Sequence, residues 1–198
     1  EIGSGLVGSE MCIRDRCKDL TQAEADLQVL IEDLVHTMER EFQRQFSLIQ
    51  QNFSIVFGEL FGGGRAELVL SDPKDILNCD IDIIAQPPGK KLQLLSLLSG
   101  GERALTAIAI LFAMLDLKPT PFCILDEIEA ALDDANVVRF AQYLRRVSDK
   151  TQFIVITHRR GTMEAADVLY GVTMQERGVS KVLTINMNDM AKELNIKG

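Results

Sequence analysis

The stretch PFCILDEIEAALDD, residues 121–134, passes from an apolar run into a cluster of acids. Phe122 to Leu125 have the continuous apolar character of a strand buried in a parallel sheet. Ligands of open α/β sheets bind at the carboxyl ends of strands. The stretch therefore predicts Asp126 as a Mg²⁺ ligand, direct or through water, and Glu127 as a base for an attacking water. Two acids that merely open a polar loop are the alternative.

A second apolar run, QFIVITH at residues 152–158, comes after a helical pattern from about Asp134 to Ser148. Strand, helix and strand in this order predict a buried parallel sheet in an α/β fold. His158 ends the second run, so we expect it at the same edge of the sheet as Asp126. A lone histidine is more often structural than catalytic, and its place at a strand end is what favours function.

The stretch LLSGGERAL, residues 97–105, opens a nearly apolar helix that should run to about Leu117. Ser99, followed three residues later by Glu102, is a capping box. A capping box does not require Gly100 and Gly101, because glycine costs roughly 1 kcal/mol relative to alanine inside a helix. Bare glycines suit a helix N-terminus that binds a phosphate. Both interpretations stay open from the residues alone.

The pattern from about Lys18 to Leu60 is that of a long amphipathic helix, which FGGGR then ends. At 1.5 Å per residue it would run roughly 60 Å, which favours a projecting coiled coil. A helix packed on its own domain is the alternative. Its apolar residues recur at steps of three and four: Leu27, Ile31, Leu34, Met38, Phe42, Phe46, Ile49 and Phe53.

Further short elements are predicted around these segments. The runs AELVL at 66–70 and ILNCDIDIIAQ at 76–86 indicate a β-hairpin or meander. A short helix near Met163 and a hairpin over 168–185 should finish the fold. Asp133 or its neighbour Asp134 could cap the helix between the two parallel strands.

Residues 1–16 share no periodicity with the helical pattern after them, and we predict that they are a non-native leader. Their GSGLVGSE run has glycines five apart, as in a phosphate loop, but lacks the lysine that comes after the second glycine. The expected domains are then a coiled-coil arm and neck helix at 17–60, a lobe at 61–190 and a polar tail at 191–198.

The net charge of −8 over 198 residues argues against a polybasic module that binds nucleic acid or a membrane surface. The net charge does not exclude a local basic patch, and a solvated helix face and loop is the alternative. Its candidates are Arg145, Arg146, Arg159 and Arg160.

The four cysteines are spaced for neither a zinc site nor a disulfide framework, which favours a reduced, cytosolic protein. Cys123 lies in an apolar run and should be a small buried side chain. The longest nearly apolar run, 104–115, is too short to span a bilayer.

Taken together, the glycine-led helix, the acid-ended strand, the acidic loop and the histidine-ended strand have the order of the C-terminal half of an ABC-type ATPase. Residues 97–144 and 151–185 closely resemble the C-terminal head half of bacterial SMC chromosome-partition proteins. The resemblance covers about residues 18–190. It implies a head with a parallel core sheet, flanking hairpins and the returning arm of a long antiparallel coiled coil.

The resemblance also implies roles for individual residues. Asp126 resembles the Walker B acid near Mg²⁺, Glu127 the catalytic base, and His158 the switch histidine that senses the γ-phosphate. The other matching positions are the signature motif that binds ATP of the opposite head, at Ser99, Gly100, Gly101 and Glu102, and the D-loop at the dimer interface, at Ala131, Leu132 and Asp133.

The implied cofactors are ATP and Mg²⁺. The implied partners are the N-terminal head half of the same chain, a second SMC head in a homodimer, a kleisin subunit and DNA, in the cytoplasm at the nucleoid and without a membrane. The sequence contains no G-x-x-x-x-G-K-[ST] motif and no identifiable glutamine loop. We therefore expect the isolated chain to be inactive as an ATPase.

Three other functions fit parts of the pattern. A transporter's nucleotide-binding subunit would usually carry basic and glutamine residues after the signature, where this chain is apolar. A coiled-coil DNA-repair ATPase similar to RecN shares the signature and Walker B logic. A kleisin-binding module without activity is the non-enzymatic alternative.

Overall fold

The computed structural model describes residues 3–187, with side chains from residue 12 onward. It divides into two compact units. One contains Glu1–Ser47 and Asp72–Cys79, and the other contains Leu48–Ser71 and Asp80–Gly198. The predicted tail at 191–198 lies outside the described residues.

Helix α1 spans Gly3–Phe61, so the predicted start near Lys18 was wrong. Residues 3–16 contain no proline, and extending an existing helix costs far less than nucleating one. The non-native origin of these residues stays a prediction. Apolar side chains of the first unit are exposed along the helix, as a coiled-coil arm would require: Leu20, Leu27, Leu30, Ile31, Leu34 and Met38.

The glycines after α1 end the helix as predicted. The φ angles of Gly62, Gly63 and Gly64 are 70°, 133° and 83°, values that residues other than glycine rarely adopt. The Gly63 N–H donates to the Gly58 carbonyl at 2.7 Å, closing the last turn. A Cβ on Gly64 would lie 2.3 Å from the Gln86 carbonyl oxygen, so the backbones meet where only glycine fits.

The next element is a three-stranded antiparallel sheet, formed by β1 (Arg65–Leu70), β2 (Ile81–Gln86) and β3 (Gln93–Leu94). The meander is confirmed, but β2 starts later than predicted and β3 was missed. Residues 75–79 form a turn instead, because the Asp75 carbonyl accepts from the N–H groups of Asn78 and Cys79. The buried side chains of this region include Phe53, Val56, Phe57, Leu60 and Phe61 of α1 with Ala66, Leu68 and Ala85 of the sheet.

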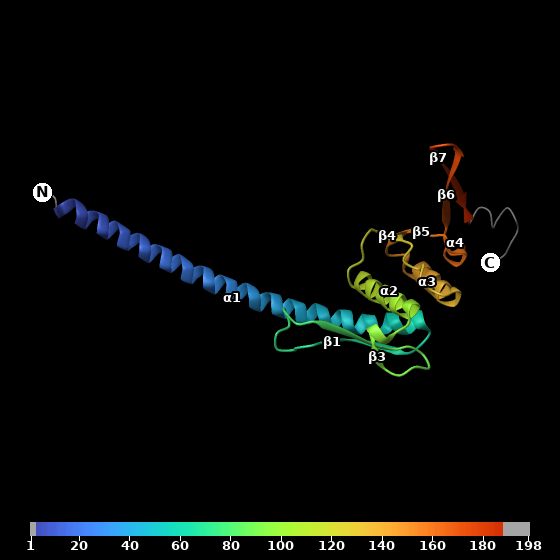
Figure 1. The fold of residues 1–198 in the computed structure, drawn as a ribbon, viewed down its shortest axis with the longest axis horizontal. Coiled ribbons are helices and arrows are strands. Elements are labelled where there is room, and N and C mark those ends of the chain that lie inside the picture. Colours follow the sequence, from blue (N-terminus) through green and yellow to red (C-terminus); the bar gives the residue numbers. More distant parts are fainter. Residues whose placement is uncertain (1–2, 188–198) are drawn as a thin grey trace. The chain divides into compact units, whose positions relative to one another are not determined.

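The parallel pair has the predicted order (Figure 1). After the short 3₁₀ helix η1 (Leu95–Leu97) come α2 (Gly100–Leu117), β4 (Phe122–Asp126), α3 (Asp134–Val147), β5 (Gln152–Ile156) and α4 (Arg160–Glu164). Strands β4 and β5 pair in parallel from Phe122↔Gln152 to Asp126↔Ile156.

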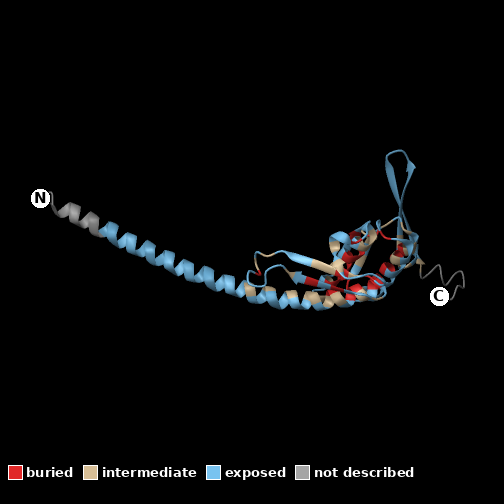
Figure 2. Ribbon diagram, turned by 60° about the horizontal axis from the view of Figure 1, so that its bottom comes forward, coloured by how far each residue is buried: buried red, intermediate tan, exposed pale blue. Residues whose placement is uncertain are grey.

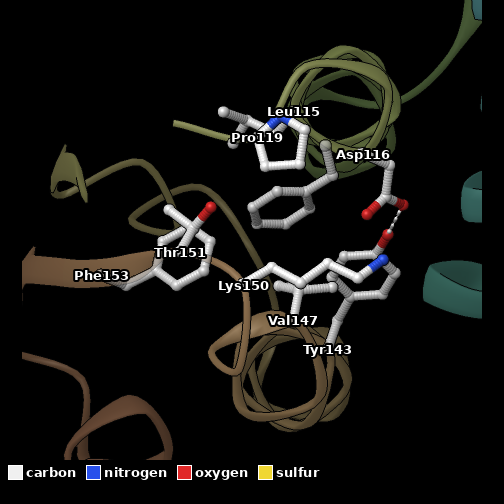
Figure 3. A pocket seen from close by; sticks show the side chains of 9 residues that line it. Leu115, Asp116, Pro119, Tyr143, Val147, Lys150, Thr151 and Phe153 are labelled. Atoms are coloured by element: carbon white, nitrogen blue, oxygen red, sulfur yellow. Dashed lines mark hydrogen bonds between the residues drawn. The ribbon is translucent and has the colours of Figure 1, made fainter. Parts of the chain in front are cut away.

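The aromatic core of this region lies where α2, α3 and β5 meet. Phe112 stacks on Phe140 and Tyr143, with ring centroids 6.0 and 4.8 Å away, and meets the Phe153 ring edge-on at 6.2 Å. Beside it is a cavity of about 10 Å³, lined by the residues drawn in Figure 3. The Tyr143 hydroxyl donates to Asp116 there at 3.0 Å, and burial raises the pKa of Tyr143. The cavity has room for about one water molecule and so is packing space rather than a ligand site.

The described residues cover the parallel pair on one face only, so the predicted burial of both faces was wrong for this part of the chain. Side chains alternate across a strand, and only one set of them meets the core. On the other face Phe122, Ile124, Ile154 and Ile156 are 57%, 59%, 47% and 52% exposed. The continuous apolar sequence of these strands thus leaves an open apolar sheet face.

The predicted C-terminal hairpin is present as β6 (Val168–Glu176) and β7 (Val179–Asn186), with an irregularity between Met174 and Glu176. Figure 2 shows the hairpin coloured as exposed along nearly its whole length. No helix in the described part of the chain is long and apolar enough to cross a membrane.

Candidate functional site

The start of α2 carries the predicted capping box. The Ser99 hydroxyl accepts from the Glu102 N–H at 3.4 Å, and the Ser99 N–H donates to the Glu102 carboxylate at 3.0 Å. Lys90 also contacts this carboxylate, 2.8 Å away. The Lys90 ammonium, followed by the contacts with Ser99, holds the pKa of Glu102 below its usual value.

The two glycines after Ser99 have different surroundings. A Cβ on Gly101 would lie 3.0 Å from the carbonyl oxygen of Ala131, whereas a Cβ on Gly100 would meet no atom of the described residues within 4 Å. Close backbone approach within this chain therefore accounts for Gly101, a reason that sequence reasoning missed. Gly100 keeps the helix N-terminus open to solvent, as anion binding would require.

The carboxyl end of β4 places two acids at the sheet edge. Asp126 is the last residue of the strand and is exposed. Glu127 comes next, with φ of 47°, the one positive φ among the described residues other than glycine. Its N–H donates to the Ile156 carbonyl at 2.9 Å, which holds it against the end of β5. A left-handed conformation costs a side-chain-bearing residue about 1–2 kcal/mol, and such strain clusters at functional sites.

His158 lies at the same edge, as predicted, although β5 ends at Ile156 and leaves the histidine in the loop after it. The strand is shorter because its pairing with β4 stops where the Glu127 backbone turns away. The His158 Nδ1 lies 3.4 Å from Glu127 Oε1. The structure thus brings together the histidine and the carboxylate that the sequence singled out.

A segment that we call the acidic loop, residues 127–133, joins β4 to α3. Leu132 is buried, and Ala131 makes the close approach to Gly101. The Asp133 carboxylate accepts from the Asn136 N–H at 2.8 Å, so Asp133 rather than Asp134 caps α3.

Three contacts that the sequence did not reveal hold the acidic loop and the start of α3 to the segment after His158. Arg159 donates to the Leu132 carbonyl at 3.0 Å and to the Asp134 carboxylate at 2.9 Å. The Glu129 Oε1 accepts from the Thr162 hydroxyl of α4 at 3.1 Å. A glutamate between an isoleucine and two alanines gave a weak signal of burial, and nothing in the sequence pointed to Thr162.

A cleft of about 350 Å³ opens beside the capping box and the end of the acidic loop. It contains three of the residues assigned to the signature and one assigned to the D-loop. Its lining consists of Phe61, Gly62, Pro87, Pro88, Ser99, Gly101, Glu102, Asp133, Asn136 and Arg139.

The arginines considered for a basic patch are largely engaged by acids. Arg146 pairs with Glu59, while Arg159 and Arg160 pair with Asp134 and Glu164. These pairs favour the alternative of a solvated, charge-balanced surface over a nucleic-acid patch.

Metal binding rests on little more than Asp126. Among the described residues, no group of three or more histidine, cysteine, aspartate or glutamate side chains is arranged to hold a metal. An exposed carboxylate at a strand end fits one ligand of a Mg²⁺ that takes its others from phosphate and water.

Cys123 is half-buried, with a pKa raised by burial.

Comparisons with known proteins identify the family of the chain. Residues 16–181 match the model for the N-terminal domain of RecF, RecN and SMC proteins. The chain belongs to the RecF/RecN/SMC family. It is 61% identical, over 89% of its length, to the chromosome partition protein Smc of Desulfitobacterium hafniense, and it spans 15% of that protein.

Solved structures show the same fold. One, from work on ATP-driven dimerization and DNA-stimulated activation of SMC ATPases, has a TM-score of 0.71 at 41% identity and covers 81% of this chain and 99% of that one. The Smc head domain of Pyrococcus furiosus, with an extended coiled coil and bound to the C-terminal domain of ScpA, has a TM-score of 0.73 at 42% identity. That match covers 82% of this chain and 42% of that one.

Proposed function

We propose that this chain is the C-terminal half of an SMC head that binds and hydrolyses ATP between two heads during chromosome condensation and partition. The observation that carries the proposal is the contact between His158 and the strained Glu127 at the carboxyl edge of β4 and β5. An acid held in this way suits a base that orients and deprotonates a water.

Five positions have separate roles in this proposal. Asp126 would hold Mg²⁺, which neutralises phosphate charge when bound. Glu127 takes a proton from the attacking water, and His158 orients the Glu127 carboxylate. Ser99 and the open N-terminus at Gly100 contact the phosphates of ATP held by the opposite head, through N–H groups and the positive end of the helix dipole.

The open apolar face of β4 and β5 supports a partner within the same head. Four large apolar side chains on a sheet face are costly to leave in water, at roughly 25 cal/mol per Å². We infer that the N-terminal head half covers this face and brings the phosphate loop. The isolated chain is then inactive, and the complete head hydrolyses ATP.

The proposal for the wider assembly rests on the solved relatives. The Pyrococcus furiosus head is bound to ScpA, so we propose that the outer face of this lobe binds a kleisin subunit. We also propose that two heads dimerize around ATP and that the dimer acts on DNA, by similarity to the SMC ATPases of the other solved structure.

The test is hydrolysis by the complete protein and by its Glu127→Gln variant. We expect the variant to form ATP-dependent dimers and to lose at least a hundredfold in kcat, as loss of a general base commonly costs about 10²–10⁴-fold. Asp149→Asn, at an exposed acid in the turn after α3, is the matched control and should keep wild-type turnover. Unchanged turnover in Glu127→Gln would remove Glu127 from this role.

A further inference from the structure

The most unusual polar group outside the proposed ATP contacts is the Glu129 carboxylate. The residue is 1% exposed, and its Oε2 has no hydrogen-bond partner among the described residues. Its Oε1 accepts from the Thr162 hydroxyl, and Thr162 is itself buried. A buried carboxyl with one oxygen unpartnered is costly compared with an apolar side chain of similar size, so packing alone does not account for it.

The position of Glu129 suggests what it does. It lies in the acidic loop, two residues after Glu127 and two before Ala131, and it reaches across to α4. Helix α4 begins just after His158. The Glu129–Thr162 hydrogen bond therefore connects the segment after Glu127 to the segment after His158.

The contacts around the Glu129–Thr162 bond restrict the movement of the acidic loop and α4. Arg159 holds the end of the acidic loop through the Leu132 carbonyl, and Gly161 would bring a Cβ within 3.1 Å of Val137 on α3. Helix α4 is therefore packed closely on α3 and cannot shift freely. Inside the loop, the N–H groups of Ala130 and Leu132 each donate at 3.0 Å to carbonyls within the loop.

We propose that Glu129 and Thr162 are positioning residues: their buried hydrogen bond sets the distance between Glu127 and His158. The expected effect on kcat rests on the proposed ATPase function, whereas the effect on the geometry of Glu127 and His158 does not. Neither residue touches the reacting atoms. Both act through the acidic loop and α4.

The experiment uses the complete protein with three variants. Thr162→Val keeps the shape of threonine but removes the donor, and Thr162→Ser keeps the hydroxyl as the matched control. Glu129→Leu removes both oxygens at similar bulk. We expect Thr162→Val to lower kcat about tenfold or more with KM for ATP unchanged, since a misplacement of about 1 Å can cost a hundredfold. Thr162→Ser should keep wild-type kcat.

A double variant separates the bond from two independent effects. If both side chains act only through their shared hydrogen bond, the double variant Thr162→Val with Glu129→Leu should lose no more kcat than the more damaging single variant. Multiplying losses, equal loss in the valine and serine variants, or a change in KM alone would each overturn the proposal.

A second readout does not depend on ATP hydrolysis. Hydrogen exchange at the Ala130 and Leu132 amides should be faster in Thr162→Val than in wild type, and unchanged in Thr162→Ser. Equal exchange in the valine and serine variants overturns the positioning claim even if the protein hydrolyses no ATP. A wild-type protein without turnover would instead overturn the proposed function, and the exchange rates would still decide this inference.

Discussion

Alanine substitutions at the two neighbouring glycines of α2 should have different effects on stability. Alanine at Gly101 gains helix propensity, worth about 0.5–1 kcal/mol, but its Cβ would lie 3.0 Å from the Ala131 carbonyl oxygen. That oxygen belongs to the backbone and must move by a few tenths of an ångström. Overpacking of this kind costs about 1–3 kcal/mol, so the net effect of Gly101→Ala is destabilising or close to zero.

Gly100→Ala is the matched control because its Cβ would meet no atom within 4 Å in the part of the chain that the structure describes. Its expected effect is stabilising, by up to about 1 kcal/mol. The free energies of unfolding of the two variants should therefore differ by about 1–3 kcal/mol, with Gly101→Ala the less stable.

Urea unfolding followed by circular dichroism measures this difference. With a slope of about 2 kcal/mol per molar urea, a difference of about 2 kcal/mol separates the midpoints by about 1 M. Coincident midpoints, or a higher midpoint for Gly101→Ala, would show that the Ala131 contact does not explain Gly101. The same pair also tests function: Gly100→Ala should fold well yet weaken ATP-driven dimerization, because a methyl group then covers the open N-terminus.

Three further outcomes concern local contacts. The pKa of Glu102 is lowered, chiefly by Lys90. The stabilising contribution of Glu102 is therefore fully present above the usual pKa of 4.5 and is lost as pH falls through the lowered pKa. The urea midpoint should fall less between about pH 7 and pH 3 in Lys90→Gln than in wild type. Asp133→Ala should lose about 1 kcal/mol of unfolding free energy through the α3 cap, whereas Asp133→Asn should keep it. Phe112→Ala should cost about 3–5 kcal/mol and lower the Tm, measured by circular dichroism, because three aromatic rings lose their common contact.

Features decided by neighbours in the sequence were predictable. The capping box needs only Ser99 and Glu102 on one helix turn, and the end of α1 needs only three glycines in a row. The shared edge of Asp126 and His158 came from a rule of topology, because the carboxyl ends of parallel strands lie together.

Features decided by residues far apart were not predictable. The contact between Gly101 and Ala131 depends on how α2 and the acidic loop pack, which no periodicity records. The burial of Glu129 has the same origin, since its isoleucine and alanine neighbours in the sequence are only a weak signal of burial. The open face of β4 and β5 was missed for another reason: an apolar strand predicts that something covers both faces, but not that the cover belongs to this segment of chain.

The acidic loop connects motifs that the proposed mechanism assigns to two different nucleotides. At one end Glu127 faces His158, and in an SMC head both would serve the ATP of their own head. At the other end Ala131 contacts Gly101 at the start of α2, which would serve the ATP of the opposite head. The loop between them is short, is held at Glu129 and Leu132, and carries its own internal hydrogen bonds. A short, anchored loop transmits displacement from one end to the other, because a packed segment has few alternative arrangements. Under the proposed function, docking of the second head against Gly100 should therefore shift Glu127 and His158 together, with their separation kept by the Glu129–Thr162 bond. Hydrolysis would then depend on the dimer rather than on ATP binding alone.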